Sequence, residues 1–266
     1  MNPSFLYDSV FEHLVLQHDS EAAGFPMENI LDWRRDVPFR WKAGSTSSPQ
    51  RCWITPLSPR LPGDTAVIAG HNLGTISAKW KIMYTDAAHP TWTDASAWVT
   101  PSDDTPSAVT FTKQTADGWM IRIEPVVGSS FSVAPQLGIV TVGERLELDQ
   151  GIMPGFDPYG ETPVRDFVRN ENGAPLGSNL RYIDKEFALE YEDSPMNTSG
   201  PFFTRFYPEL LPHLRTKPVW FGWNLSEDIT AIYLCWAEGK ITTPFASLTT
   251  LRDLRIVLKG TMEIAL

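Results

Sequence analysis

The chain has 266 residues, 42% of them hydrophobic and 20% charged, which suits one large or two ordinary globular domains. Its net charge is −10 and it contains no basic run, which excludes a protein that binds the nucleic-acid backbone. No apolar run reaches the roughly 18 residues of a membrane span, and the amino terminus lacks a signal-peptide pattern. We therefore expect a soluble cytosolic product without membrane insertion.

The first half of the sequence predicts short strands separated by turns, as the 22 Pro and 18 Gly of the chain also suggest. The expected strands cover residues 12–16, 51–57, 66–69, 75–84, 109–112, 119–124 and 139–143. Between the third and fourth strands, Gly70 and Asn72 tolerate the backbone conformations of a tight loop. This half is therefore expected to form an antiparallel β-sandwich.

A cluster of Gly and Pro at 148–160 marks a boundary near residue 150, giving domains 1–149 and 150–266. Beyond it, alternation predicts one long strand over 182–192, apolar strands over 219–223 and 232–236, and one or two strands over 251–266. A short helix is expected around 203–214, interrupted by Pro208 and Pro212. The fold class is thus all-β, a sandwich followed by a smaller β-rich domain with a short helix.

The two cysteines, Cys52 and Cys235, lie in different halves and are each followed by Trp in a strand-like run. This placement indicates buried, small apolar residues and leaves no disulfide within a domain. The five histidines show neither His-Glu-x-x-His spacing nor a cysteine partner at zinc-ligand spacing.

His71 admits two interpretations. As a loop residue it could contact a sugar or a partner, or its imidazole could hydrogen-bond the turn backbone beside Asn72 and hold the loop. The Gly70–Gly74 loop has no Lys-Ser/Thr, so it is not a phosphate-binding loop.

Four carboxylates form an acidic cluster, namely Glu186, Glu190, Glu192 and Asp193. Paired carboxylates could hydrolyse a glycoside, but alternate positions on an exposed strand face explain them equally well. We therefore expect no catalytic residues and no enzymatic activity.

Four tryptophans fall in turn-rich segments, namely Trp33, Trp41, Trp92 and Trp98. They could offer stacking faces to sugar rings, plug the ends of the sandwich, or anchor a subunit interface. The other six fall in strand-like runs and are expected in the core or at interfaces: Trp53, Trp80, Trp119, Trp220, Trp223 and Trp236.

Three motifs in the first half resemble the galactose-binding-like (discoidin-type) jelly roll of bacteriophage tail proteins: Asn29-Ile30-Leu31-Asp32 followed by Phe39-Arg40-Trp41, the stretch Val67–Gly74, and the segment from Leu137 to Leu148. The resemblance covers roughly residues 10–148. It implies a jelly-roll fold and possible glycan contacts at His71, Asn72, Trp92 and Trp98. It also implies a possible structural Ca²⁺ near Asp32 and Asp36, with no other cofactor.

The second half is similar to the β-rich modules of phage distal tail proteins. The similarity is carried by Lys217-Pro218-Val219-Trp220-Phe221-Gly222-Trp223 and Ile232–Trp236, with Asn224 where such proteins commonly have Asp. It implies a structural protein of the virion, assembled in the host cytoplasm into a siphophage-like tail tip or baseplate.

The sequence thus supports three hypotheses. In the first, the chain forms a homo-oligomeric ring of six or three copies that joins the tail tube to hub and fibre proteins, because long strands and a terminal strand offer edges to neighbours. In the second, it is a carbohydrate-binding module for host surface glycans. In the third and weakest, it is a glycan hydrolase that uses the acidic cluster around Glu190.

Overall fold

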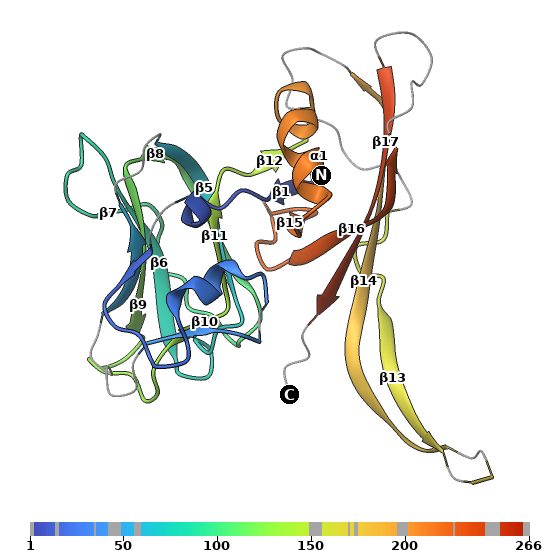
Figure 1. The fold of residues 1–266 in the computed structure, drawn as a ribbon, viewed down its shortest axis with the longest axis horizontal. Helices are drawn as coiled ribbons and strands as arrows, with labels where there is room; N and C mark the ends of the chain where they lie inside the picture. The colour runs from blue at the N-terminus through green and yellow to red at the C-terminus, as the bar shows by residue number, and fades with distance from the viewer. Residues whose placement is uncertain are drawn as a thin grey trace. The chain divides into compact units, whose positions relative to one another are not determined.

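The computed structural model describes residues 3–13, 16–34, 36–41, 49–55, 60–148, 156–169, 171–172, 175–195, 202–225, 227–242 and 251–262 (Figure 1). The chain divides into two compact units. Unit 1 comprises Met1–Phe5 and Leu146–Leu266, and unit 2 comprises Leu6–Arg145. Within the described residues, no helix is long and apolar enough to cross a membrane.

The amino-terminal strand belongs to unit 1 because it pairs with a strand far along the sequence. β1 (Ser4–Leu6) is antiparallel to β12 (Leu146–Glu147), with Phe5 opposite Leu146. The Gly/Pro cluster near residue 150 therefore lies close to one crossing between the units, and the other crossing follows Phe5.

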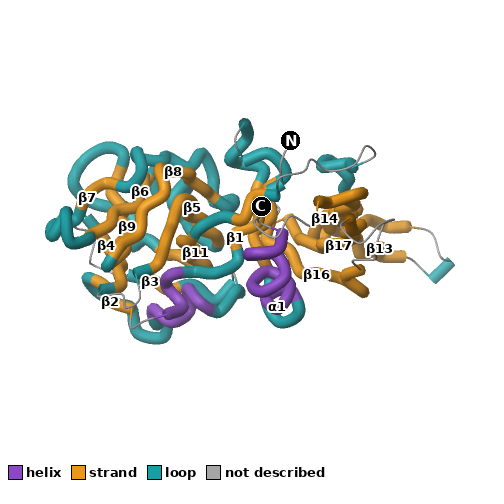
Figure 2. The backbone as a smooth tube through the Cα atoms, turned by 90° about the horizontal axis from the view of Figure 1, so that it is seen from above, coloured by secondary structure: helices purple, strands orange, loops and turns teal. Residues whose placement is uncertain are grey.

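Unit 2 is built from antiparallel sheets that Figure 2 shows as neighbouring layers of strands. One sheet has five strands in the order β2 (Leu16–His18), β4 (Gln50–Ile54), β9 (Gly118–Pro125), β6 (Ala78–Thr85) and β7 (Thr93–Asp94). Another has the order β11 (Ile139–Gly143), β5 (Leu61–Ala69) and β8 (Ser107–Ala116), and a short pair joins β10 (Gln136–Leu137) to β3 (Phe39–Arg40). The expected β-sandwich is confirmed.

A single hydrophobic core joins these sheets. Trp80 and Trp119 of the five-stranded sheet are wholly buried, as is Ile68 of the three-stranded sheet. The indole Nε1 of Trp80 donates a 3.0 Å hydrogen bond to Ser107 Oγ, so that tryptophan is fixed by a polar contact as well as by packing. Trp33, by contrast, is half-buried and has a positive φ of 47°.

The expected first strand over 12–16 is wrong at its start, where the chain forms a 3₁₀ turn, η1 (Val10–His13). Ser9 begins the turn: its carbonyl oxygen accepts a hydrogen bond from Glu12 N, and its Oγ accepts one from Phe11 N. Side-chain capping of this kind favours a helical turn over a strand. The strand begins later, at Leu16. A second 3₁₀ turn, η2 (Met27–Leu31), lies in the segment expected to be rich in turns.

The loop 70–77 carries the chain from one sheet to the other, since β5 and β6 belong to different sheets. Gly70 supplies the positive φ of 60° with which the loop begins. Asn72 ties the loop to a distant segment: its Nδ2 donates to Ala134 O at 3.1 Å and its Oδ1 accepts from Gln136 N at 2.9 Å. The loop is therefore a fixed crossover and not a simple hairpin turn.

Unit 1 contains a seven-stranded sheet, in the order β12, β1, β15 (Val219–Gly222), β16 (Ile232–Thr242), β17 (Leu251–Met262), β14 (Pro175–Pro195) and β13 (Thr162–Arg169). The expected helix is present as a π-helical segment, η3 (Phe202–Leu210), followed by α1 (Leu211–Leu214). Pro208 lies inside the π-helical segment, where its missing N–H removes one backbone hydrogen bond of the helix.

The terminal strand was expected to offer an edge to a neighbouring subunit, but β17 lies inside the sheet, between β16 and β14. At this end of the described sheet the edge strand is β13, which pairs with β14 alone. Both cysteines are buried thiols outside any disulfide, as the sequence predicts, and burial raises the pKa of the Cys52 thiol.

Lysine 185 lies on the buried face of β14, beside Phe187. Its ammonium is 3.0 Å from Glu161 Oε1 and 5.3 Å from the centre of the Tyr233 ring. A buried cation needs such a partner, because removal from water penalises its charged form. The carboxylate and the ring together hold Lys185 inside unit 1.

We predict that Gly74→Ala destabilises unit 2 by about 1–3 kcal/mol. A Cβ at this position would overlap the backbone of Asp103, so the crossover or the facing segment has to move. Urea unfolding followed by tryptophan fluorescence measures the loss. Ala87→Gly, on an exposed loop of the same unit, should stay within about 0.5 kcal/mol of wild type. Equal stability of Gly74→Ala and wild type would contradict this packing.

Candidate functional site

The outer face of the five-stranded sheet carries alternate residues of β4, β9 and β6, whose other residues enter the core. Along β6, for example, Trp80, Ile82 and Tyr84 belong to the core. The intervening residues of these strands point to the opposite side of the sheet because side chains alternate along a strand. We call them the outer face; they are Arg51, Trp53, Lys79, Lys81, Met83, Met120, Arg122 and Glu124.

Three cations lie in one row across this outer face. Arg51 of β4 is directly opposite Arg122 of β9, and Arg122 is directly opposite Lys81 of β6. Neighbouring strands are about 4.8 Å apart, so the row places three positive side chains at regular short spacing. Like charges in opposite positions destabilise a sheet, so this row exists at an energetic cost.

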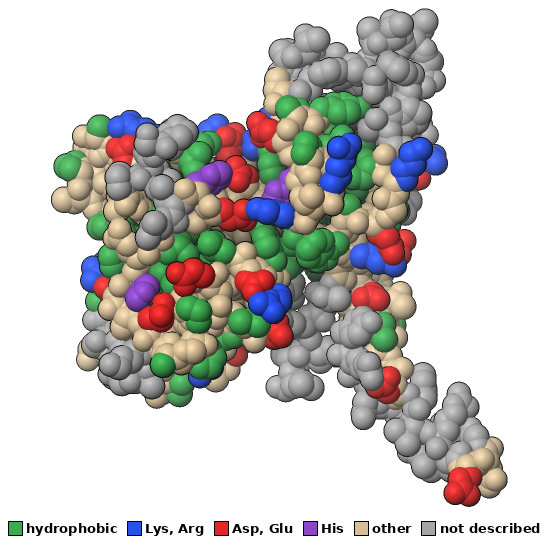
Figure 3. Space-filling model, in the orientation of Figure 1, with side chains coloured by type: hydrophobic (Ala, Val, Ile, Leu, Met, Phe, Trp, Pro, Cys, Tyr) green, Lys and Arg blue, Asp and Glu red, His purple; other side chains and the backbone are tan. Residues whose placement is uncertain are grey.

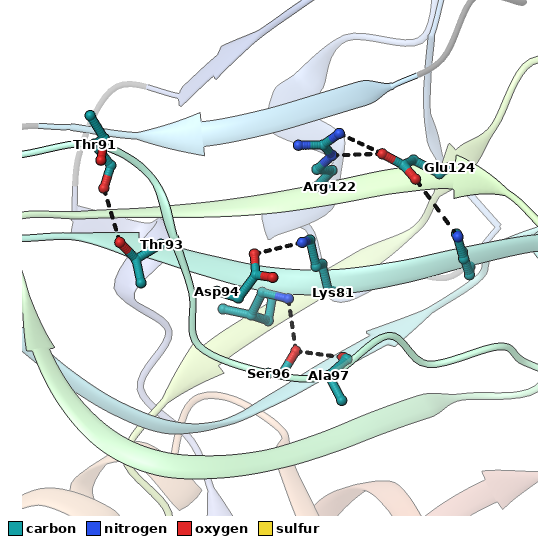
Figure 4. Close-up of polar contacts among 10 residues, drawn as sticks. Lys81, Thr91, Thr93, Asp94, Ser96, Ala97, Arg122 and Glu124 are labelled. Carbon is teal, nitrogen blue, oxygen red and sulfur yellow. Dashed lines mark hydrogen bonds and ion pairs between the residues drawn. The ribbon is translucent and has the colours of Figure 1, made fainter. Parts of the chain in front are cut away.

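Carboxylates at the margins partly offset that cost (Figure 4). Lys81 Nζ is 2.5 Å from Asp94 Oδ1, while Arg122 donates to Glu124 Oε1 through Nε at 2.9 Å and Nη2 at 2.5 Å. Lys79 Nζ approaches the second oxygen of Glu124 at 3.8 Å. These ion pairs fix the directions in which the cations point.

Arg51 has a separate partner on the other side of the row. Its Nε and Nη2 donate to the two carboxylate oxygens of Asp19 at 3.1 and 3.0 Å. This paired geometry is the one a planar guanidinium prefers for a carboxylate.

Two half-buried tryptophans border the charged row. The ring of Trp98 receives two ammonium groups, Lys79 Nζ at 4.7 Å and Lys81 Nζ at 4.6 Å from its centre. Trp53 occupies the next row, opposite Met120, which is itself opposite Met83. The outer face thus combines fixed charges with two half-buried aromatic rings, while Met83 and Met120 are themselves buried, at 7% and 3% exposure.

His71 is not on this face but inside the crossover loop, where only 3% of the residue is exposed. Its Nδ1 accepts a hydrogen bond from Leu73 N at 3.3 Å. Burial lowers the pKa of His71 to about 4, although Asp104, Asp103 and the backbone of Thr105 act in the opposite direction. Near neutral pH the imidazole is therefore uncharged and helps hold the loop.

The structure does not gather the four residues proposed as glycan contacts. His71 and Asn72 belong to the loop that precedes Ala78, whereas Trp92 adjoins β7, whose Thr93 pairs with Tyr84 at the far end of β6. Those two ends of β6 are roughly 20 Å apart. Trp98 lies between them, in contact with Lys79 and Lys81.

The acidic residues considered for metal binding are placed apart from any cluster of ligands. Asp32 accepts hydrogen bonds from Arg34, which lowers the pKa of the aspartate, and Asp36 is exposed. Among the described residues, no group of three His, Cys, Asp or Glu side chains is arranged to hold a metal ion. Of the remaining turn tryptophans, Trp41 is fully buried against Phe39, with ring centres 4.5 Å apart.

The described carboxylates of the acidic cluster face cations on β17. Glu190 is 3.5 Å from Arg255 and Glu186 is 4.0 Å from Lys259, and all four side chains are exposed. The side chains of Glu192 and Asp193 lie outside the described residues. The two described carboxylates thus belong to ion pairs on the exposed face of β14.

Sequence reasoning missed the charged row of the outer face. The signal that could have found its members is the alternation of Lys79, Lys81 and Met83 with apolar residues, and the same pattern in β9. The pattern does not contain the register that sets Arg51, Arg122 and Lys81 side by side, because that register joins strands far apart in the sequence.

No protein-family model matches the sequence, and no curated protein matches it. Among solved structures, it is similar to a family 32 carbohydrate-binding module of C. perfringens NanJ, solved in complex with galactose. The identity is 16% and the TM-score 0.41, over 53% of this chain and 98% of that one. It is also similar to chitosan-binding module 1 of a chitosanase/glucanase from Paenibacillus sp. IK-5, at 18% identity and a TM-score of 0.39, over 49% and 94% of the two chains.

A third similarity is to a putative alpha-L-fucosidase from Bacteroides thetaiotaomicron, at 17% identity and a TM-score of 0.41. It covers 52% of this chain and 28% of the fucosidase, so the match spans little more than a quarter of that enzyme. These structural neighbours include carbohydrate-binding modules, and none of the three is a tail protein. At these values, what each neighbour binds is a property of that neighbour alone.

We predict that His71 makes the protein less stable in acid. The unfolded chain takes up a proton near the ordinary histidine pKa of 6.5, whereas the folded chain resists it down to about 4. The free energy of unfolding should therefore fall as the pH drops from about 6.5 to 4, by up to about 3 kcal/mol from this residue. Urea unfolding between pH 7.5 and 4 measures the slope.

The substitution His71→Gln, which cannot take up this proton, should flatten the pH dependence. His13→Gln serves as the control, because His13 is exposed beside Asp8. It should retain the wild-type slope. An unchanged slope in His71→Gln would show that other groups cause the acid sensitivity.

Proposed function

We propose that the protein is a non-catalytic glycan-binding protein that uses the outer face of unit 2. The observation that carries the proposal is the pairing of half-buried Trp53 and Trp98 with a fixed network of charged side chains on one sheet. A saccharide presents apolar C–H faces and many hydroxyl groups. Indole rings suit the first, and oriented donors and acceptors suit the second.

Three features of the outer face support this function. Its donors and acceptors are held by ion pairs, so little order has to be gained on binding. The buried side chains of Met83 and Met120 continue the row of Trp53 and support the position of that ring. The tryptophans lie on strand β4 and beside β6, so the strands set their spacing.

A second candidate is a structural subunit of a phage tail tip, as the resemblance to distal tail proteins implies. The observation that favours it is the open edge of unit 1: β13 pairs with β14, and no described strand lies on its other side. An open edge can pair with a second copy. In this proposal the copies form a closed ring in the virion, between tail tube, hub and fibres. The two functions are compatible in one chain.

We predict that Trp53→Ala and Trp98→Ala each weaken glycan binding about tenfold or more, since each removes a stacking face. A glycan array identifies a ligand, and isothermal titration calorimetry measures its dissociation constant. Trp236→Ala is a matched control because Trp236 is 52% exposed and lies in unit 1. Binding unaffected in both test variants would exclude the outer face. Binding to nothing on the array would overturn the glycan-binding function.

For the second candidate, we predict an oligomer in size-exclusion chromatography with light scattering, and a monomer after one of two substitutions, Arg165→Pro or Asp166→Pro. Successive N–H groups of a strand point to opposite sides, so one of these prolines blocks the open edge while the other disturbs pairing with β14. Circular dichroism checks folding. A wild type that remains monomeric at high concentration would contradict assembly through β13.

A further inference from the structure

We infer that the glycan bound by the outer face carries carboxylates, as a polyuronate does, and that these groups bind along the row of Arg51, Arg122 and Lys81. The inference rests on the glycan-binding function proposed above and names the class of glycan. It derives from the charges of the face, whereas the binding function derives from its aromatic rings.

The first support is the cost of the row itself. Two cations in directly opposite positions repel each other, and here the repulsion occurs twice in succession, between Arg51 and Arg122 and between Arg122 and Lys81. Each cation is paired with one carboxylate, of Asp19, Glu124 or Asp94, which reduces this repulsion. An anionic ligand lying across the three strands would reduce it further.

The second support is the balance of charge. The face and its margin hold four cations against three carboxylates, so they carry one excess positive charge. The whole chain carries a net charge of −10. In Figure 3, acidic and basic side chains are interspersed on the face in view. A local excess of one cation on an acidic protein favours an anionic ligand at this face.

The third support concerns which anion fits. Arg51 already binds one carboxylate through two parallel hydrogen bonds, those to the Oδ atoms of Asp19. The flat guanidinium therefore lies in the orientation that a planar carboxylate requires. Arg122, with its side chain 33% exposed, presents the same group in the middle of the row.

Lys81 completes the row as a fixed positive charge. Its side chain is 9% exposed and its ammonium is held between Asp94 and the ring of Trp98, so it cannot move to follow a ligand. Asp94 itself is 55% exposed, so a saccharide carboxylate can compete with it for Lys81 while the sugar ring contacts Trp98.

The experiment compares oligogalacturonate with its methyl ester, in which each negative carboxylate is replaced by a neutral ester. We expect the protein to bind the acid at least tenfold more tightly than the ester in calorimetry at low salt, and this preference to shrink as salt is added. Arg122→Gln should abolish the preference, because it removes the central cation while Glu124 keeps Lys79 as its neighbour. Thermal unfolding verifies that the variant is folded.

Arg60→Gln is the matched control. Arg60 also forms two hydrogen bonds with one carboxylate, that of Asp117. Its side chain is 47% exposed, compared with 33% for Arg122. It lies outside the row, so the preference for the acid should survive its removal.

The outcomes separate this inference from the function on which it rests. Equal binding of acid and ester would leave glycan binding in place and overturn the inference. A preference for the acid that persists in Arg122→Gln would overturn the row as its origin. Equal retention of sulfated dextran or single-stranded DNA would show binding of any polyanion and overturn the choice of carboxylate. Binding of no saccharide would overturn both proposals.

Discussion

The register of strands β4, β9 and β6 is the constraint on which the candidate site depends. Ile54, Trp119 and Tyr84 lie opposite one another and belong to one core. Because side chains alternate, a slip of one residue in β9 or β6 would bury charges and expose a tryptophan, and a slip in β4 would bury Arg51 and expose Cys52 and Ile54. The burial of Trp119 and its neighbours therefore fixes the positions of the cations on the other side of the sheet. Packing in the core thus fixes the strand register, and the register fixes which charged residues are neighbours on the outer face.

The sequence predicts the architecture better than the site, for a physical reason. Alternation and turn residues are local signals, so the strands of unit 2 and the helix near Pro208 could be anticipated. The 3₁₀ turn at Val10–His13 could not be anticipated. It is capped by the hydrogen bond from Phe11 N to Ser9 Oγ, and whether this bond forms depends on the surrounding fold. The row of Arg51, Arg122 and Lys81 depends on pairing between strands roughly 30 to 70 residues apart, which no local pattern contains.

In unit 1, local sequence signals predicted the terminal strand but not its position in the sheet. The terminal segment is apolar and alternating, and its position at the chain end suggested an accessible edge. In the structure β17 pairs with both β16 and β14, which places it in the interior of its sheet, and Leu254, Ile256 and Leu258 on its inner face are fully or almost fully buried. The edge strand at this end of the described sheet is β13. On the solvent-facing side of β14 and β17, charged residues of the two strands form ion pairs, such as Glu190 with Arg255.

The pairing of β1 with β12 makes unit 2 an insertion within unit 1. During synthesis the first strand must wait for some 140 residues before its partner exists, whereas every strand of unit 2 finds its partners within that interval. Unit 2 can therefore fold on the ribosome first, and its folding brings Leu6 and Arg145 together, which lowers the entropy cost of closing β1 onto β12. An inserted unit with adjacent ends can also be exchanged as one segment during evolution, with little disturbance to the strands that flank it.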